Sequence, residues 1–379
     1  MSLPIDGALD ATRLPRLAAG LAEERAGGGA PGGQLYVELD GVAVADAGFG
    51  EARPGEAMTR GHLMAWMSTG KPVAAAAILR LWEAGALDLD DPVARHWPEF
   101  AAGGKQRITV RHLLTHTAGL RMLDTGWPAA GWDEILARIA ARRLEPGWTP
   151  GRKAGYHLTS SWFVLGELVR RLDGRRFERW VREELFEPLG AADCWIGMPE
   201  ERHRDYGGRL APMYELAAAG PRDVGWQSAA RVTRPSPGAN GWGPIRELAR
   251  FYRMLAAGGE LDGRRYLSRQ TVEAMTARHR VGLVDHTFRA RLDWGLGVIV
   301  NSAHYGEARV PYGYGPHAGP RTWGHSGARS SVALVDPDAG LVALLAFDGL
   351  ADDERHRARM ERLLAALYED LGRAPAVVE

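Results

Sequence analysis

A serine and a lysine three positions apart open an apolar stretch of this chain. Ser68 and Lys71 stand directly before Pro72, and the run VAAAAILRLW follows. Proline lacks an amide hydrogen and fits only the first turn of a helix, so a helix should begin close to Ser68. Residues three apart share one helix face. We therefore expect the hydroxyl and the amine to lie side by side.

The apolar surroundings bear on the chemistry of Lys71. Ala74, Ala75 and Ile78 continue the same helix face. An amine that loses hydration among apolar neighbours has a lowered pKa, and a neutral amine can take a hydroxyl proton to leave a nucleophilic oxygen. The alternative is that Ser68 caps the helix and Lys71 extends to solvent, which is usual for an isolated S-x-x-K pair.

The composition restricts the other classes of function. The chain has 379 residues, with 47 basic and 47 acidic side chains, and this balance argues against nucleic acid or an anionic membrane as the main partner. The single Cys194 excludes an internal disulfide and a multi-cysteine metal site. We expect a small-molecule substrate, no metal and no cofactor. The first residues lack an export signal and no segment has transmembrane length, which predicts a cytoplasmic protein. The oligomeric state stays open.

Helices and antiparallel strands must position these groups. Alternating segments at 34–39 and 42–50 flank Asp40-Gly41, a strong signal for a β-hairpin. Further strands are expected at 294–300, 330–336 and 341–347. Helices are expected over residues 9–25, 69–84, 109–115, 132–143, 159–173, 176–185, 245–259 and 352–371.

This order of elements predicts an α+β fold. An antiparallel sheet would be built from both ends of the chain and flanked by helices, with a mainly helical insertion between. Residues 1–90 and 240–379 are expected to form the sheet domain, and residues 91–239 the helical domain. The active site would lie in the cleft between them.

Several segments occur in the order of a known family. They are STGK, ITVRHLLTHTAGL, the segment around Tyr156, FEPLGAAD, WGLGV and WGHSGARSSVALVDPDAG. On these segments the sequence resembles the serine β-lactamase and penicillin-binding-protein superfamily. The likeness is greatest to its class C-like branch of family VIII carboxylesterases, transesterases and D-aminopeptidases. The resemblance covers about residues 30 to 350 and implies the β-lactamase/transpeptidase-like fold.

The resemblance also implies catalytic roles. Ser68 matches the nucleophile and Lys71 its proton partner. Tyr156 matches the tyrosine of the family's Y-x-N motif, where a phenolate held by Lys71 would accept the serine proton. The backbone N–H groups of Ser68 and Ala328 would form the oxyanion hole.

Substrate contacts are implied by the same comparison. His325, Ser326 and Gly327 match the K-T-G strand, along whose edge the substrate would lie. His157 would offer a polar contact. Aromatic residues in loops or beside motifs are expected to line an acyl pocket, the alternative being ordinary core packing. They are Trp127, Trp132, Trp148, Trp242, Trp323, Tyr312 and Tyr314.

One departure from the family pattern concerns substrate choice. The second motif of the family ends in asparagine, and here Leu158 stands in its place. In β-lactamases of the family that asparagine binds the substrate amide. Its loss therefore counts against β-lactamase activity.

Two rival sites fit the sequence less well. Ser326 lies in GHSGA, which misses the G-x-S-x-G nucleophile elbow because position 328 is alanine. His112 and His116 have the spacing of a zinc pair, but Leu113 replaces the glutamate of H-E-x-x-H.

The sequence thus predicts a serine hydrolase that works through an acyl-enzyme. A carboxylic ester is the preferred substrate, because esters need less help with the leaving group than amides do. The alternatives are an amidase or D-amino-acid peptidase, an acyltransferase, and a non-catalytic penicillin-binding-like sensor.

Overall fold

A large antiparallel sheet joins the two ends of the chain in the computed structural model, which describes residues 3–306 and 312–374. The strand order is β1-β3-β2-β18-β17-β16-β15-β14, and β4 pairs with β3. The strands are β1 (Ile5–Leu9), β2 (Gly32–Leu39), β3 (Val42–Arg53), β4 (Glu56–Ala57), β14 (Asp293–Trp294), β15 (Ile299–Val300), β16 (Trp323–Gly327), β17 (Ser331–Asp336) and β18 (Leu341–Phe347). The expected α+β fold, with a sheet from both ends, is confirmed.

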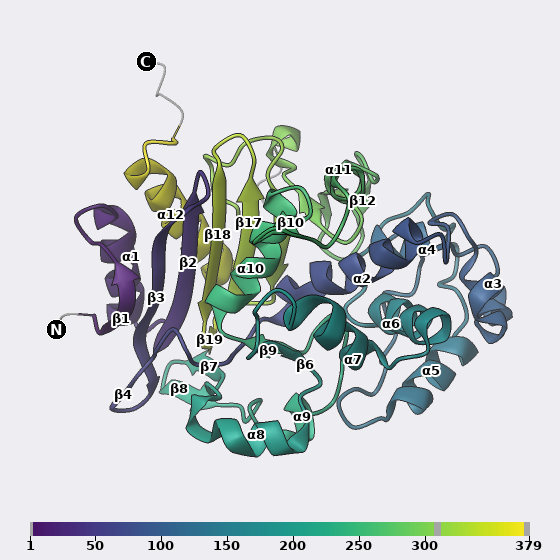
Figure 1. Ribbon diagram of the computed structural model, residues 1–379, viewed down its shortest axis with the longest axis horizontal. Helices are drawn as coiled ribbons and strands as arrows, with labels where there is room; N and C mark the ends of the chain where they lie inside the picture. The colour runs from purple at the N-terminus through teal and green to yellow at the C-terminus, as the bar shows by residue number, and fades with distance from the viewer. Residues whose placement is uncertain (1–2, 307–311, 375–379) are drawn as a thin grey trace.

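Helices cover both faces of this sheet and fill the middle of the chain (Figure 1). They are α1 (Pro15–Ala26), α2 (Lys71–Glu83), α3 (Val93–His96), α4 (Val110–Leu114), α5 (Trp132–Ala141), α6 (Ser160–Asp173), α7 (Phe177–Val181), α8 (Glu200–Tyr206), α9 (Ala229–Val232), α10 (Ile245–Ala256), α11 (Arg269–Thr276) and α12 (Asp353–Asp370). Helices α1 and α12 pack on one face, and α10 packs on the other.

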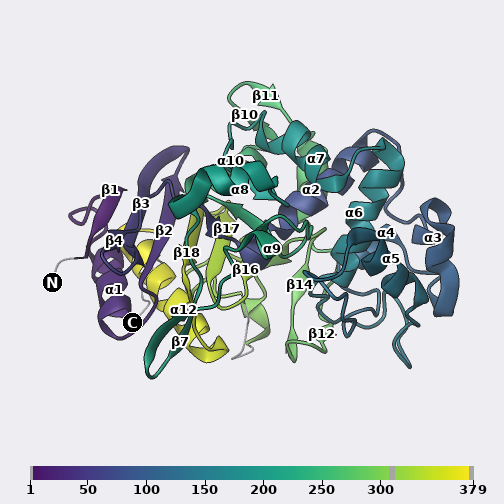
Figure 2. The same cartoon turned by 90° about the horizontal axis from the view of Figure 1, so that it is seen from below.

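The pleat of the strands separates two hydrophobic cores. Val335 and Leu344 point toward α2 and α10, whereas Leu334 and Leu345 point toward α1 and α12. The first core continues without a break through α2 to α6. Figure 2 shows α2 between the sheet and the helices α3 to α6. The division at residues 90 and 240 stays a prediction, since one core spans both parts.

Small strand groups surround the large sheet. One consists of β5 (Met64–Ala65), β9 (Gly241–Gly243) and β6 (Trp195–Ile196), and another of β19 (Gly349–Leu350), β7 (Tyr214–Ala217) and β8 (Gly220–Asp223). Two further pairs are β10 (Glu260–Leu261) with β11 (Arg264–Arg265), and β12 (Val284–Asp285) with β13 (Ala290–Arg291). The hairpin of β7 and β8 lies in a stretch that was expected to hold helices and loops alone.

The first hairpin forms as predicted. Asp40 and Gly41 have φ angles of 50° and 82°, so both central residues are left-handed, as in a type I′ turn. The helix expected over 9–25 is wrong at its start, because residues 5–9 form edge strand β1 and the helix begins at Pro15. The strand expected over 294–300 is also wrong. It is split into β14 and β15, and the link between them contains Gly297 with φ 79°.

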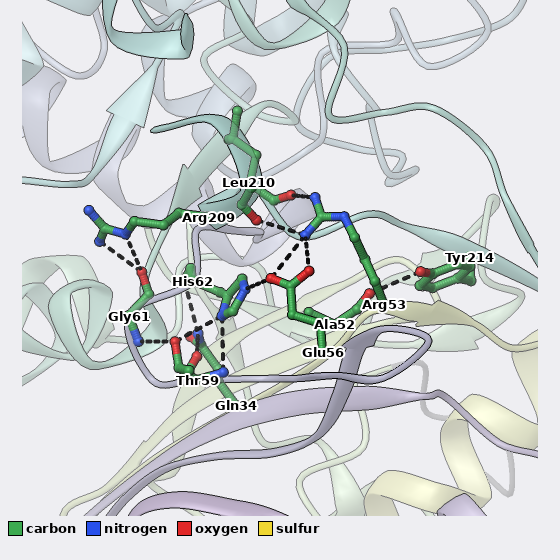
Figure 3. Close-up of polar contacts among 11 residues, drawn as sticks. Gln34, Ala52, Arg53, Glu56, Thr59, Gly61, His62, Arg209, Leu210 and Tyr214 are labelled. Atoms are coloured by element: carbon green, nitrogen blue, oxygen red, sulfur yellow. Dashed lines mark hydrogen bonds and ion pairs between the residues drawn. The ribbon is translucent and has the colours of Figure 1, made fainter. Parts of the chain in front are cut away.

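A polar network fastens the turn after β3 to the segment that leads into β7 (Figure 3). His62 Nδ1 accepts from the backbone N–H of Thr59 at 3.0 Å, and its Nε2 contacts Glu56 at 3.3 Å. Arg53 donates to the carbonyl oxygen of Leu210 at 2.7 Å, and the Tyr214 hydroxyl donates to Ala52 O at 2.9 Å. The start of β7 is therefore fixed to the sheet.

Strand β16 approaches the turn before α2 so closely that only glycine fits at position 327. A Cβ on Gly327 would lie 2.1 Å from Ser331 Oγ and 2.5 Å from the Trp66 carbonyl oxygen. We predict that Gly327→Ala lowers the free energy of unfolding by about 1–3 kcal/mol, because the backbone must move to relieve the overlap. Urea denaturation measures this loss.

Gly208→Ala is the matched control, since a Cβ there would meet no atom within 4 Å. Equal stability of the two variants would contradict the steric argument.

Candidate active site

Ser68 lies in a single 3-10 turn, Met67–Gly70, directly before α2. Met67 has a φ of 55°, a left-handed conformation that is costly for a bulky residue and is found most often at functional sites. The turn is held from both sides: the indole N–H of Trp66 donates to Gly243 O at 2.8 Å, and the Ser331 hydroxyl donates to Trp66 O at 2.8 Å. The Ser68 hydroxyl is therefore set by neighbours on β9 and β17.

Lys71 is completely buried, with 0% of its surface exposed. Its Nζ lies 3.0 Å from Ser68 Oγ, 2.9 Å from Leu158 O and 2.5 Å from Gly238 O. None of these partners is a carboxylate. Burial lowers the pKa of the Lys71 amine well below its ordinary value, which confirms the expectation from the apolar helix face.

Tyr156 stands beside this pair, with the Lys71 Nζ 5.1 Å from the centroid of its ring. Burial raises the pKa of the Tyr156 phenol above its ordinary value, and a hydrogen bond with Ser68 offsets this only in part. The phenolate that is expected to be held by Lys71 stays a prediction, and burial opposes it. The amine directs its hydrogen bonds toward Ser68 and two carbonyl groups, and burial favours the protonated form of the phenol.

Rings pack tightly behind Tyr156. The His116 ring centroid lies 4.6 Å from that of Tyr156 and 4.4 Å from that of Trp294, while the Lys71 Nζ lies 5.3 Å from the ring of Trp162. His116 Nδ1 accepts from the backbone N–H of His157 at 2.9 Å. These rings exclude water from the inner side of the amine and explain its lowered pKa.

A buried ion pair fixes the backbone of Tyr156. The N–H of Tyr156 donates to Asp285 Oδ1 at 3.2 Å, and Asp285 pairs with Arg280 at 3.1 Å. Both charged side chains are almost fully buried. Such a pair is costly to break, so it holds the tyrosine in one place.

The segment around residue 325 runs along the opposite side of the site. His325 Nδ1 donates to Ser326 O at 2.8 Å, which leaves Nε2 as an acceptor with no partner among the described residues. Burial and the nearby Lys71 lower the pKa of His325 to about 3, so the ring is neutral. Ser326 is half-buried.

The two amides expected to form the oxyanion hole belong to segments that pack against each other. Gly327 packs against the turn before α2, which brings the exposed Ala328 to the vicinity of Ser68. Within residues 3–306 and 312–374, neither the Ser68 nor the Ala328 backbone N–H donates to an acceptor. Their role with substrate stays a prediction.

Three side chains that are expected to contact substrate are buried among protein neighbours. His157 is fully buried, and both its ring nitrogens are used, by Leu120 N at 3.0 Å and Ser161 Oγ at 2.9 Å. The indole N–H of Trp242 donates to Asn240 Oδ1 at 2.9 Å within a buried cluster. Trp323 is buried against Tyr252 and borders a separate cavity of about 500 Å³. Each side chain is occupied by protein neighbours.

The other expected pocket aromatics are scattered. Tyr312 and Tyr314 stack on each other in the core that includes α12, and Trp148 donates to Thr117 O at 3.0 Å. Trp132 is bonded to Glu167 at 3.1 Å. Trp127 is half-buried and stays accessible.

Sequence reasoning missed several groups around Lys71. The carbonyl oxygens of Leu158 and Gly238 carry no side-chain signal, because any residue has one. Asp285 and Arg280 lie far from the motifs in sequence and no pattern announces them. His116 lies in the motif segment THTAGL, but its packing against Tyr156 depends on the fold and could not be predicted from the sequence.

Leu158 has an unusual environment for a large apolar residue. Its side chain is 61% exposed while its carbonyl oxygen binds Lys71. The position that holds asparagine in the family's second motif therefore presents an apolar side chain to solvent beside the buried amine.

Comparison with known proteins places this arrangement. The β-lactamase family profile matches residues 17–367. The chain belongs to the β-lactamase family. Esterase/beta-lactamase LipL of Mycobacterium tuberculosis is 30% identical over 359 residues, which cover 84% of this chain and 77% of LipL. The solved structure of a penicillin-binding protein homologue from Caulobacter crescentus is 30% identical, with a TM-score of 0.79 over 97% of this chain and 100% of that chain. A family VIII carboxylesterase is 29% identical, with a TM-score of 0.78 over the same shares.

Two kinds of feature are absent from residues 3–306 and 312–374. No helix among them has the length and apolar character to cross a bilayer. Likewise, within that part of the chain, no three His, Cys, Asp or Glu side chains come together as a metal site would require.

The buried amine makes stability depend on pH. The folded state binds the Lys71 proton more weakly than the unfolded chain, where lysine has its ordinary pKa of 10.5. Between the lowered value and 10.5 unfolding takes up a proton, so the wild type gains stability as pH rises. Relative to Lys71→Met, this gain should reach at most about 1.4 kcal/mol per pH unit. Urea denaturation between neutral and alkaline pH measures it.

Lys153→Met is the matched control, because that lysine is exposed. Parallel stability curves for wild type and Lys71→Met would contradict a lowered pKa at Lys71.

Proposed function

We propose that the protein is a carboxylesterase that works through an acyl-enzyme on Ser68. The observation that carries this proposal is the contact of 3.0 Å between Ser68 Oγ and a fully buried Lys71 Nζ that has no carboxylate partner. A relative that is 30% identical is named an esterase/beta-lactamase, and a solved structure that is 29% identical is a family VIII carboxylesterase. Both names support an ester substrate.

Lys71 acts as the general base in this mechanism. Because burial lowers its pKa well below the ordinary value and so favours the neutral form, the amine can accept the Ser68 proton over their short contact. The oxygen of Ser68 then attacks the ester carbonyl. The negative charge on the carbonyl oxygen is stabilised by the backbone N–H groups of Ser68 and Ala328.

Tyr156 serves as the general acid. Its protonated phenol, hydrogen-bonded to Ser68, can pass its proton to the leaving alcohol and be reprotonated through Lys71. Water then attacks the acyl group, and Lys71 and Tyr156 carry out the proton transfers in the reverse direction. In this proposal the substrate lies in the cleft between the sheet and the helical part, with His325, Ser326 and Gly327 along one edge.

Other members of the same reaction class differ only in the second nucleophile or the leaving group. An amidase, a D-amino-acid peptidase or an acyltransferase could use the same three side chains. The exposed Leu158 favours esters over lactams, because it offers no hydrogen bond to a substrate amide. A non-catalytic sensor would form the acyl adduct and keep it.

A substrate panel tests the proposal. p-Nitrophenyl esters of graded length, a chromogenic cephalosporin and D-alanyl amides are compared, and the acyl adduct is followed by intact mass. We expect turnover of esters, and a loss of about 10⁴-fold or more in Ser68→Ala with no adduct. Ser326→Ala should still form the adduct at Ser68.

Three outcomes would overturn parts of this scheme. An adduct in Ser68→Ala would move the nucleophile elsewhere. Cephalosporin turnover faster than ester turnover would make the protein a β-lactamase. An adduct that forms on wild type and never turns over would make it a sensor.

Leu158 tests the choice between ester and lactam. Leu158→Asn restores an amide at the exposed position, so kcat/KM for the cephalosporin should rise about tenfold while ester kcat/KM stays within about threefold. Steady-state kinetics of both substrates measure this. Leu158→Ala is the control, and an equal rise in Leu158→Ala would show that removing bulk, rather than adding the amide, is responsible.

A further inference from the structure

Arg231 in α9 is held between two indole rings. Its guanidinium carbon lies 4.0 Å from the ring centroid of Trp226 and 4.6 Å from that of Trp127. The cation is therefore packed between two aromatic rings, and its N–H groups are the part that can still bind a ligand.

That edge has no partner within the part of the chain that the structure describes. The guanidinium of Arg231 forms no ion pair and no hydrogen bond there. Burial alone, with no acidic neighbour, lowers the pKa of Arg231 to about 10. Its nitrogens are also not among the enclosed polar atoms that lack a partner, so the edge is open to solvent. A desolvated cation with an open fork suits a carboxylate.

The α9 side of this clamp is tied to the loop that holds Lys71. Asn240 Nδ2 donates to Arg231 O at 2.9 Å, and Asn240 follows two residues after Gly238, whose carbonyl oxygen binds the Lys71 amine. Two residues of chain span at most about 7 Å. The backbone of Arg231 is therefore tied to the segment whose carbonyl oxygen binds Lys71.

The Trp127 side of the clamp is tied to the other wall. Thr125 Oγ1 lies 3.4 Å from Thr159 Oγ1, and Thr159 directly follows Leu158, the second residue whose carbonyl oxygen binds Lys71. The indole N–H of Trp127 also donates to Arg234 O at 3.3 Å. Trp127 and Arg231 thus come from segments that border the amine on both sides.

We propose that Arg231 binds a carboxylate of the substrate that is remote from the ester bond, so that the preferred substrate is an anionic ester. The proposal rests on the ester-hydrolase function and names its substrate class. The carboxylate belongs either to the acyl group, as in a hemiester of a dicarboxylic acid, or to the leaving alcohol. In both cases it would form a forked, charge-assisted pair with the open edge of Arg231.

Matched pairs of anionic and neutral esters show whether Arg231 binds a carboxylate of the acyl group or one of the leaving alcohol. For the acyl half, p-nitrophenyl hydrogen adipate and suberate are compared with p-nitrophenyl hexanoate and octanoate. For the alcohol half, the butyrate ester of 4-hydroxybenzoate is compared with that of its methyl ester. Shorter hemiesters are avoided because their free carboxylate attacks the ester internally. We expect Arg231→Gln to lower kcat/KM about tenfold or more, mainly through KM, for the anionic member of one pair.

The neutral members should change less than about twofold in Arg231→Gln. Arg231→Lys should lose most of the preference as well, because an ammonium group cannot form the stacked fork. Arg234→Gln is the control, because the side chain of Arg234 is exposed. This substitution removes the same charge from the same loop and should leave the preference for anionic esters intact. An equal loss on anionic and neutral esters would make Arg231 a structural clamp and overturn the proposal, as would no loss on either.

A binding measurement separates this proposal from the esterase function. Adipate and 4-hydroxybenzoate are titrated into wild type and Arg231→Gln by calorimetry. At least one of these two anions should bind wild type at least about tenfold more tightly than it binds Arg231→Gln. This result without hydrolysis of any ester would keep the anion site and reject the esterase. Hydrolysis of neutral esters with equal binding to both proteins would keep the esterase and reject the anion site.

Discussion

The burial of one amine organises the site in this protein. A charged ammonium group without a carboxylate partner is costly in an apolar interior, so Lys71 is driven toward its neutral form. The three oxygens around it can hydrogen-bond the amine, yet they supply no full negative charge that would hold the proton. The same enclosure that excludes water therefore prepares the amine to accept a proton from Ser68.

Distant segments must meet for this enclosure to exist. Leu158 lies two residues before the start of α6 in the helical part, and Gly238 lies just before β9. The turn before α2 is fixed by β9 and β17, and Gly327 allows β16 to approach it. The rings that pack behind Tyr156 close the inner side of the enclosure around Lys71. The continuous core from the sheet through α2 to α6 keeps these pieces in register.

Much of the fold could be predicted from local signals. The hairpin at Asp40-Gly41 formed because both positions tolerate the left-handed turn that it needs. The start of the chain was misjudged because the short edge strand of residues 5–9 has too few residues to show a clear period. The stretch 294–300 was misjudged because Gly297 ends the pairing that its apolar neighbours suggest.

The sequence by itself determined which groups could react: Ser68 and Lys71 at helical spacing, the proline that places them in a first turn, and Tyr156 by its motif. Only the tertiary structure decided their states and partners. It raised the pKa of the buried Tyr156 phenol, gave Lys71 two backbone carbonyl groups, and used His157 and Trp242 for internal bonds. The physical reason is that pKa values and free hydrogen-bonding capacity depend on burial and on neighbours from distant segments, which no local pattern specifies.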